Sequence, residues 1–138
     1  MLDLPFNHTV SIVIITVIIS LIAFSNQNVM NRLIFWPPAM QKGQYDRFIT
    51  HGFIHADGTH LLFNMIPLFF FGSVIESFYR QYFYELGFVL FYLGGLIVAI
   101  IPSYLKHKND HRWASLGASG AVSAVLFAYI LFEPWKLI

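Results

Sequence analysis

Gly117-Ala118-Ser119-Gly120 stands directly before the apolar run Ala121–Phe132, and the rest of the chain is best understood from this stretch. The run is apolar enough to lie in lipid. The Ser119 hydroxyl, at the N-terminal end of this run, would therefore lie within the membrane. Small residues also let neighbouring helix backbones approach closely. We therefore expect a central membrane helix that carries a polar group at its start.

The composition of the 138-residue chain indicates an integral membrane protein. Hydrophobic residues make up 57% of the chain and charged residues 11%, which is too apolar for a water-soluble core of this size. The 15 Phe, 7 Tyr and 3 Trp suit helices that face acyl chains and are anchored at the interfaces. The formal net charge of +1 gives no case for nucleic acid as a partner, and the lack of cysteine excludes disulfides and thiolate chemistry.

The apolar runs predict an all-α membrane bundle with four transmembrane helices, at about residues 7–25, 59–79, 82–105 and 113–132. The first run has no cleavable leader pattern, so we expect it to be retained. Residues 25–58, between the first two spans, are too many for a plain connector and too apolar for a free one. We expect this long first loop to be folded and partly embedded in the interface.

A second polar motif, His60-Leu-Leu-Phe-Asn64, opens the second span. His60 and Asn64 are four residues apart and share one helix face, which must point inward because polar groups in hydrocarbon face protein or water. Considered singly, the pair also fits an interhelical hydrogen-bonding pair, and Ser119 fits a packing residue.

Together the two motifs indicate acyl transfer, which needs a nucleophile, a base and donors that stabilise the oxyanion. Ser119 supplies a hydroxyl, and the glycines beside it expose backbone N–H groups at a helix start, where the helix dipole favours negative charge. His60 and Asn64 add side-chain donors from one face of the neighbouring helix. We therefore predict an oxyanion hole with three contributors.

The order and spacing of these elements resemble the rhomboid family of intramembrane serine proteases. The matching positions are Arg47, His51, His55, His60, Asn64, Gly72, Glu76 and Gly117–Gly120. The match extends over about residues 46–132 and involves several spaced motifs. It implies a rhomboid-like helical bundle with a long, partly embedded first loop.

The resemblance implies a serine endopeptidase that cleaves transmembrane segments of membrane proteins through an acyl-enzyme. It implies that Ser119 is the nucleophile, that His60 and Asn64 stabilise the oxyanion, and that Arg47 is a characteristic arginine of the first loop. The implied partners are membrane-protein substrates and the lipid bilayer, with no cofactor and no metal. Asp46 stands where the family usually has Trp, and this departure affects the local packing of the loop.

The resemblance also implies a base that no residue of this chain matches. Rhomboid proteases pair the serine with a histidine on a sixth span, whereas four spans are predicted here. We therefore expect residues 1–138 to form a rhomboid-like membrane domain that is incomplete at the C-terminus and inactive by itself. His107 and His111 lie in a hydrophilic loop and match no family position, so we expect them to be solvated structural residues.

Three other interpretations stay open at this point. A catalytically inactive rhomboid-like protein could bind membrane clients, although it would need no oxyanion hole. His51, His55 and His60 could bind zinc, although no His-Glu-x-x-His arrangement is present. A transporter or channel component would carry more mid-membrane charge than Glu76 and Glu85 supply.

The two indications of membrane topology disagree. The resemblance implies a multi-pass protein of the bacterial inner membrane with a cytosolic N-terminus, which places residues 25–58 and 106–112 outside. These two loops hold six of the eight Lys and Arg, whereas the positive-inside rule would place them in the cytosol. We follow the resemblance for the expected orientation.

Overall fold

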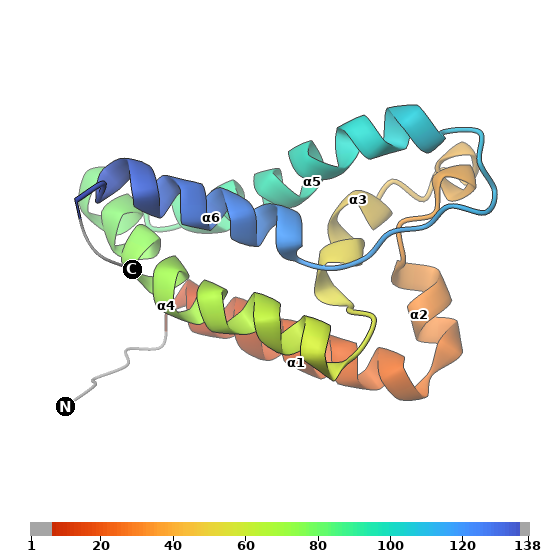
Figure 1. The fold of residues 1–138 in the computed structure, drawn as a ribbon, viewed down its shortest axis with the longest axis horizontal. Helices are drawn as coiled ribbons and strands as arrows, with labels where there is room; N and C mark the ends of the chain where they lie inside the picture. The colour runs from red at the N-terminus through yellow and green to blue at the C-terminus, as the bar shows by residue number, and fades with distance from the viewer. Residues whose placement is uncertain (1–6, 136–138) are drawn as a thin grey trace.

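The computed structural model describes residues 7–135, and helices dominate this range (Figure 1). The four main helices are α1 (His8–Ser25), α4 (Gly58–Tyr82), α5 (Gly87–His107) and α6 (Ser119–Phe132). The long first loop folds into α2 (Gln27–Leu33), η1 (Pro37–Lys42), α3 (Arg47–Thr50) and η2 (His51–Phe53). In Figure 1, α6 lies between α4 and α5, and α1 packs on the far side of α4. The predicted all-α membrane bundle with a folded first loop is thus confirmed.

Helix lengths separate the predicted spans into two groups. Within residues 7–135, α1, α4 and α5 are long and apolar enough to cross a membrane, with 18, 25 and 21 residues. α6 is apolar but has 14 residues. The fourth span was expected over residues 113–132, yet the helix begins only at Ser119, because residues 113–118 leave the helical path to pair with the first loop.

Side-chain caps fix where two of the helices begin. The Asn7 carboxamide oxygen accepts the Val10 N–H at 2.8 Å, and the Asp57 carboxylate accepts the His60 N–H at 2.8 Å. Such caps satisfy N–H groups that have no acceptor inside their own helix. The Asp57 cap therefore sets the position of His60 in the first turn of α4.

A buried carboxylate joins α4 to the first turn of α1. Glu76 is 1% exposed and accepts the backbone N–H groups of His8 and Thr9 at 2.9 and 2.8 Å. It also accepts the Thr9 hydroxyl at 2.7 Å and a guanidinium N–H of Arg80 at 3.1 Å. A negative charge at a helix N-terminus is stabilised by the helix dipole as well as by these bonds. Glu76 therefore holds α1 against α4 from inside the bundle.

Close approach of α5 and α6 depends on residues that have little or no side chain. A Cβ added to Gly120 would lie 2.4 Å from Ala99 Cβ, and one added to Gly95 would lie 3.2 Å from Ala121 Cα. Gly94, in contrast, has open space beside it. The expected contact through small residues is therefore present, and it is made by Gly95 and Gly120.

We predict that Glu76→Ala lowers the free energy of unfolding by about 3 kcal/mol, because it leaves buried donors of α1 without an acceptor. Unfolding in mixed micelles, followed by circular dichroism, measures this loss. Glu85→Ala is the matched control, since Glu85 is exposed and lies between α4 and α5. Equal stability of the two variants would show that the Glu76 contacts contribute nothing.

Candidate active site

The first loop binds the backbone that leads into Ser119 at three successive points. Phe35 and Ser115 exchange two backbone hydrogen bonds, each 2.9 Å long. The Gly117 N–H donates to the His51 carbonyl at 2.8 Å, and the Ala118 N–H donates to His55 Nε2 at 3.2 Å. The start of α6, and with it Ser119, is therefore positioned by the first loop.

Hydrogen bonding fixes the tautomer of His55, a fully buried residue. The Ser20 hydroxyl donates to the Phe53 carbonyl at 3.0 Å and lies 3.1 Å from His55 Nδ1. Because its proton is directed to Phe53, Ser20 Oγ accepts from the Nδ1–H of the imidazole. Nε2 then carries a free lone pair, as the bond from Ala118 requires. His55 is thus a neutral imidazole that links α1 to the start of α6.

Electrostatics agree with this assignment. Burial lowers the pKa of His55 to about 4, and the neighbouring His60 ring, at 5.0 Å between centroids, shifts it in the same direction. Burial also lowers the pKa of His51, whose Nδ1 lies 2.9 Å from the Arg47 carbonyl. A protonated His55 would lose its acceptor for the Ala118 N–H. The site therefore depends on a neutral ring at position 55.

We predict that the protein loses stability as the pH falls from about 6.5 towards 4. In this window an unfolded His55 binds a proton that the folded protein excludes, so stability rises with pH and is complete above 6.5. The contribution to the slope approaches about 1.4 kcal/mol per pH unit.

His55→Gln provides the comparison, because glutamine keeps an acceptor near the position of Nε2 and does not titrate. Thermal unfolding in detergent at several pH values should give a flatter pH profile for the variant than for the wild-type chain. Superimposable profiles would contradict the proposed state of His55.

His60 packs against the backbone just before the serine. Its Nδ1 accepts the Ala56 N–H at 3.3 Å, so its proton is on Nε2. A Cβ added to Gly117 would lie 2.9 Å from His60 Cε1 and 3.2 Å from Nε2. Gly117 also has a φ of +111°, a conformation that side chains rarely adopt. Glycine at this position is what allows the donor edge of His60 to lie beside the serine segment.

Asn64 lies one turn further along α4 and is 6% exposed. Its amide nitrogen donates to the His60 carbonyl at 2.9 Å, which uses one of its two N–H groups. Within residues 7–135, Asn64 and Ser119 form no hydrogen bond with each other. The structure therefore brings His60 to the serine segment, and Asn64 lies one turn further along the same helix.

Ser119 is exposed at the first turn of α6 and lines a cavity of about 180 Å³ together with Ala99, Ser103 and Ser115. Its hydroxyl has no hydrogen-bond partner among the described residues. Within the same range, the N–H groups of Ser119 and Gly120 also have no acceptor, since Ala118 offers no side-chain cap. Unpaired N–H groups at a helix start attract negative charge. The nucleophile candidate therefore lies beside donors suited to an anion.

The remaining candidate residues have structural contacts. His107 stacks on Trp113 at 4.4 Å between centroids, and the His111 carbonyl accepts the Trp36 indole N–H at 3.0 Å. Among residues 7–135, no group of three or more His, Cys, Asp or Glu side chains is placed to hold a metal ion. The His51, His55 and His60 side chains have separate partners, as described above.

Comparison with known proteins gives the family. The sequence profile of the rhomboid domain matches residues 42–138. This chain belongs to the rhomboid family. The rhomboid match includes Arg47, His60, Asn64 and Ser119, and it begins at the end of η1. The resemblance inferred from the motifs is thereby confirmed.

Two curated relatives illustrate the extent of the rhomboid similarity. RHOMBOID-like protein 12, mitochondrial, from Arabidopsis thaliana is 30% identical over 127 residues, which cover 80% of this chain and 36% of the relative. Rhomboid protease GlpG from Enterobacter sp. (strain 638) is 31% identical over 126 residues, covering 88% of this chain and 41% of the relative. The chain thus spans well under half the length of these two rhomboid proteins.

Proposed function

We propose that this rhomboid chain carries the nucleophile and the oxyanion donors of an intramembrane serine endopeptidase. Ser119 is the nucleophile, and His60 and Asn64 stabilise the oxyanion. The observation that carries the proposal is the packing of His60 against Gly117, which places an imidazole N–H beside the segment that ends in an unbonded serine hydroxyl. A purely structural serine would gain nothing from this neighbour.

The chemistry follows from these positions. Ser119 Oγ attacks the carbonyl carbon of a peptide bond, and the carbonyl oxygen becomes an oxyanion. The Ser119 N–H and His60 Nε2–H would donate to this charge, and the second N–H of Asn64 is also available to it. Cleavage of the C–N bond releases an amine, which takes up the proton that the base received from the serine, and leaves an acyl-enzyme. Water then hydrolyses the ester to release the carboxyl product and regenerate Ser119.

The serine proton must pass to a base during this attack. No side chain between residues 7 and 135 is within hydrogen-bonding distance of the Ser119 hydroxyl. We assign the base to the dyad histidine of rhomboid proteases, which no residue of this chain matches. Residues 1–138 alone should therefore not react with a fluorophosphonate more than a Ser119→Ala variant does. Robust labelling of Ser119 would show that a base is present within this chain.

We place the protein in a bacterial inner membrane with a cytosolic N-terminus, and we propose membrane proteins with a transmembrane segment as substrates. The cavity beside Ser119 would then open towards the outer leaflet, where water can enter. The first loop and the loop between α5 and α6 lie together at that end of the bundle (Figure 1). Both supply residues next to the proposed site.

The direct test uses a polypeptide in which this chain continues into the helix that bears the dyad histidine. Ser119→Ala should abolish cleavage of a transmembrane reporter, and His60→Ala should lower the rate by about 100- to 1000-fold, as loss of an oxyanion donor does. Ser123→Ala is the matched control, because Ser123 is also exposed and lies one turn along α6. Cleavage that survives Ser119→Ala would refute the proposed function and leave a client-binding rhomboid-like protein as the alternative.

A further inference from the structure

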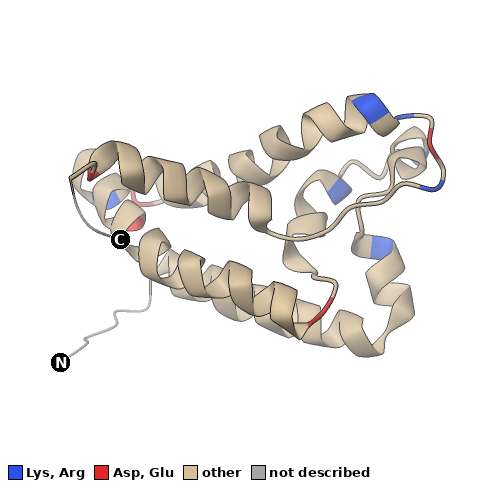
Figure 2. Cartoon of the chain, in the orientation of Figure 1, with Lys and Arg blue, Asp and Glu red and all other residues tan. Residues whose placement is uncertain are grey.

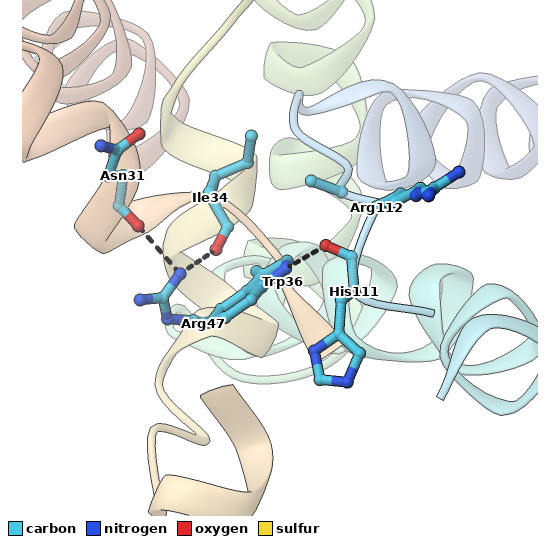
Figure 3. Close-up of a pocket in the computed structure, with 7 residues that line it drawn as sticks. Asn31, Ile34, Trp36, Arg47, His111 and Arg112 are labelled. Carbon is cyan, nitrogen blue, oxygen red and sulfur yellow. Dashed lines mark hydrogen bonds between the residues drawn. The ribbon is translucent and has the colours of Figure 1, made fainter. Parts of the chain in front are cut away.

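A second cavity, of about 500 Å³, lies between the first loop and the loop that joins α5 to α6 (Figure 3). Its lining residues are Asn31, Ile34, Trp36, Arg47, His111, Arg112 and Ala114. Among the residues described, none of those that line it is acidic. The cavity is separate from the one that holds Ser119, and its residues have no part in the proposed chemistry.

Arg47 is a buried cation that forms no ion pair with a carboxylate of residues 7–135. It is 6% exposed, and its Nε donates to the Gln44 side chain while Nη1 donates to the Asn31 and Ile34 carbonyls at 2.9 and 2.7 Å. Within residues 7–135, Nη2 has no partner. The adjacent carboxylate, Asp46, pairs with Arg32 at 2.9 Å. Buried charges are normally paired, so this guanidinium is suited to an added anion.

Further positive charge surrounds the cavity. Arg112 lies on the opposite side of Trp36 from Arg47 in Figure 3, and its guanidinium has no ion pair or hydrogen bond with residues 7–135. Lys42 lies 5.8 Å from the centre of the Trp36 ring. Figure 2 shows that basic residues gather at this end of the molecule, where the two loops meet. Few acids offset them, so the field at the cavity favours an anion.

The part of the cavity lining between Arg47 and Arg112 is apolar, and Trp36 and Ile34 form it. Trp36 is held in place by the bond from its indole N–H to the His111 carbonyl at 3.0 Å, and Ile34 lies beside it. Tryptophan is the residue typical of the membrane interface, where headgroups meet acyl chains. A cationic cavity with an indole wall at the end of a transmembrane bundle suits a molecule that is charged at one end and apolar at the other.

We propose that this cavity binds the phosphate of an anionic phospholipid headgroup, with Arg47 as the buried contact and Arg112 closing over the headgroup from the rim. Guanidinium groups match phosphate oxygens with paired donors, which makes such bonds strong and directional. Inorganic phosphate could also bind the two guanidinium groups, but it has no apolar part that would contact Trp36. The site is independent of the proposed protease chemistry. A lipid bound here would join the first loop to the loop that precedes α6.

The experiment is native mass spectrometry of the 138-residue chain in an uncharged detergent, titrated separately with phosphatidylglycerol, phosphatidylcholine and inorganic phosphate. Arg112→Gln and Lys108→Gln form the matched pair, because both residues are exposed in the same loop and each change removes one positive charge. Only Arg112 of these two lines the cavity. Arg47→Gln is unsuitable as the deciding variant, since Arg47 also joins α2 to α3.

Phosphatidylglycerol should bind more tightly than phosphatidylcholine, and Arg112→Gln should weaken its binding by about 10-fold, as loss of a charge-assisted contact does. Lys108→Gln should weaken it by less than about 2-fold. Equal losses of phosphatidylglycerol affinity in Arg112→Gln and Lys108→Gln would show that the lipid is attracted by the overall surface charge, and would refute a specific site in this cavity. Equal binding of phosphatidylcholine would refute the need for net negative charge, and equally tight binding of inorganic phosphate would refute a lipid ligand.

Discussion

The hydrogen bond from the Ala118 N–H to His55 Nε2 is the contact on which the geometry around Ser119 depends. It is buried, and the two partners come from segments 63 residues apart in the sequence. α6 has no side-chain cap at its N-terminus, so its first turn is fixed from outside the helix. The bond from Gly117 to the His51 carbonyl and the Phe35–Ser115 pair complete this attachment. A folded first loop is therefore a condition for a defined position of Ser119.

α1 supports both ends of this arrangement although it contributes no residue to the proposed chemistry. Ser20, near the C-terminal end of α1, orients the His55 ring. The first turn of α1 is bound by Glu76 of α4. His60, which faces Gly117, is on the same helix as Glu76. Displacement of α1 would therefore disturb the two supports of the serine segment together. Within the described chain, α1 thus connects the support of the bundle to the support of the site.

The apolar runs and the small residues could predict the bundle, because burial and close packing depend on residue type alone. The folded nature of residues 25–58 also follows from local sequence. The start of α6 was predicted only in part. The glycines beside Ser119 indicated a helix start there, but residues 113–118 are mostly apolar and were included in the expected fourth span. Their path is set by Phe35, His51 and His55, which are distant in sequence.

The role of His55 illustrates the same limit for the site. Its spacing from His51 and His60 matched a family motif and left a zinc site as an alternative, and neither pattern says which atom an imidazole will bind. The partner turned out to be a backbone N–H, and the tautomer depends on a serine of α1. Likewise, Glu76 was recognisable as a motif residue, but its contact with His8 and Thr9 required the packed helices. Sequence therefore located the candidate residues, and tertiary contacts decided what each one does.

Nuclear magnetic resonance of the chain with 15N-labelled histidine and alanine tests the central contact most directly. At neutral pH we predict a His55 ring that is protonated at Nδ1 only, with a scalar coupling across the hydrogen bond between Nε2 and the Ala118 amide nitrogen. A ring protonated at Nε2, or one that carries both protons, would contradict the claim that His55 positions the serine segment.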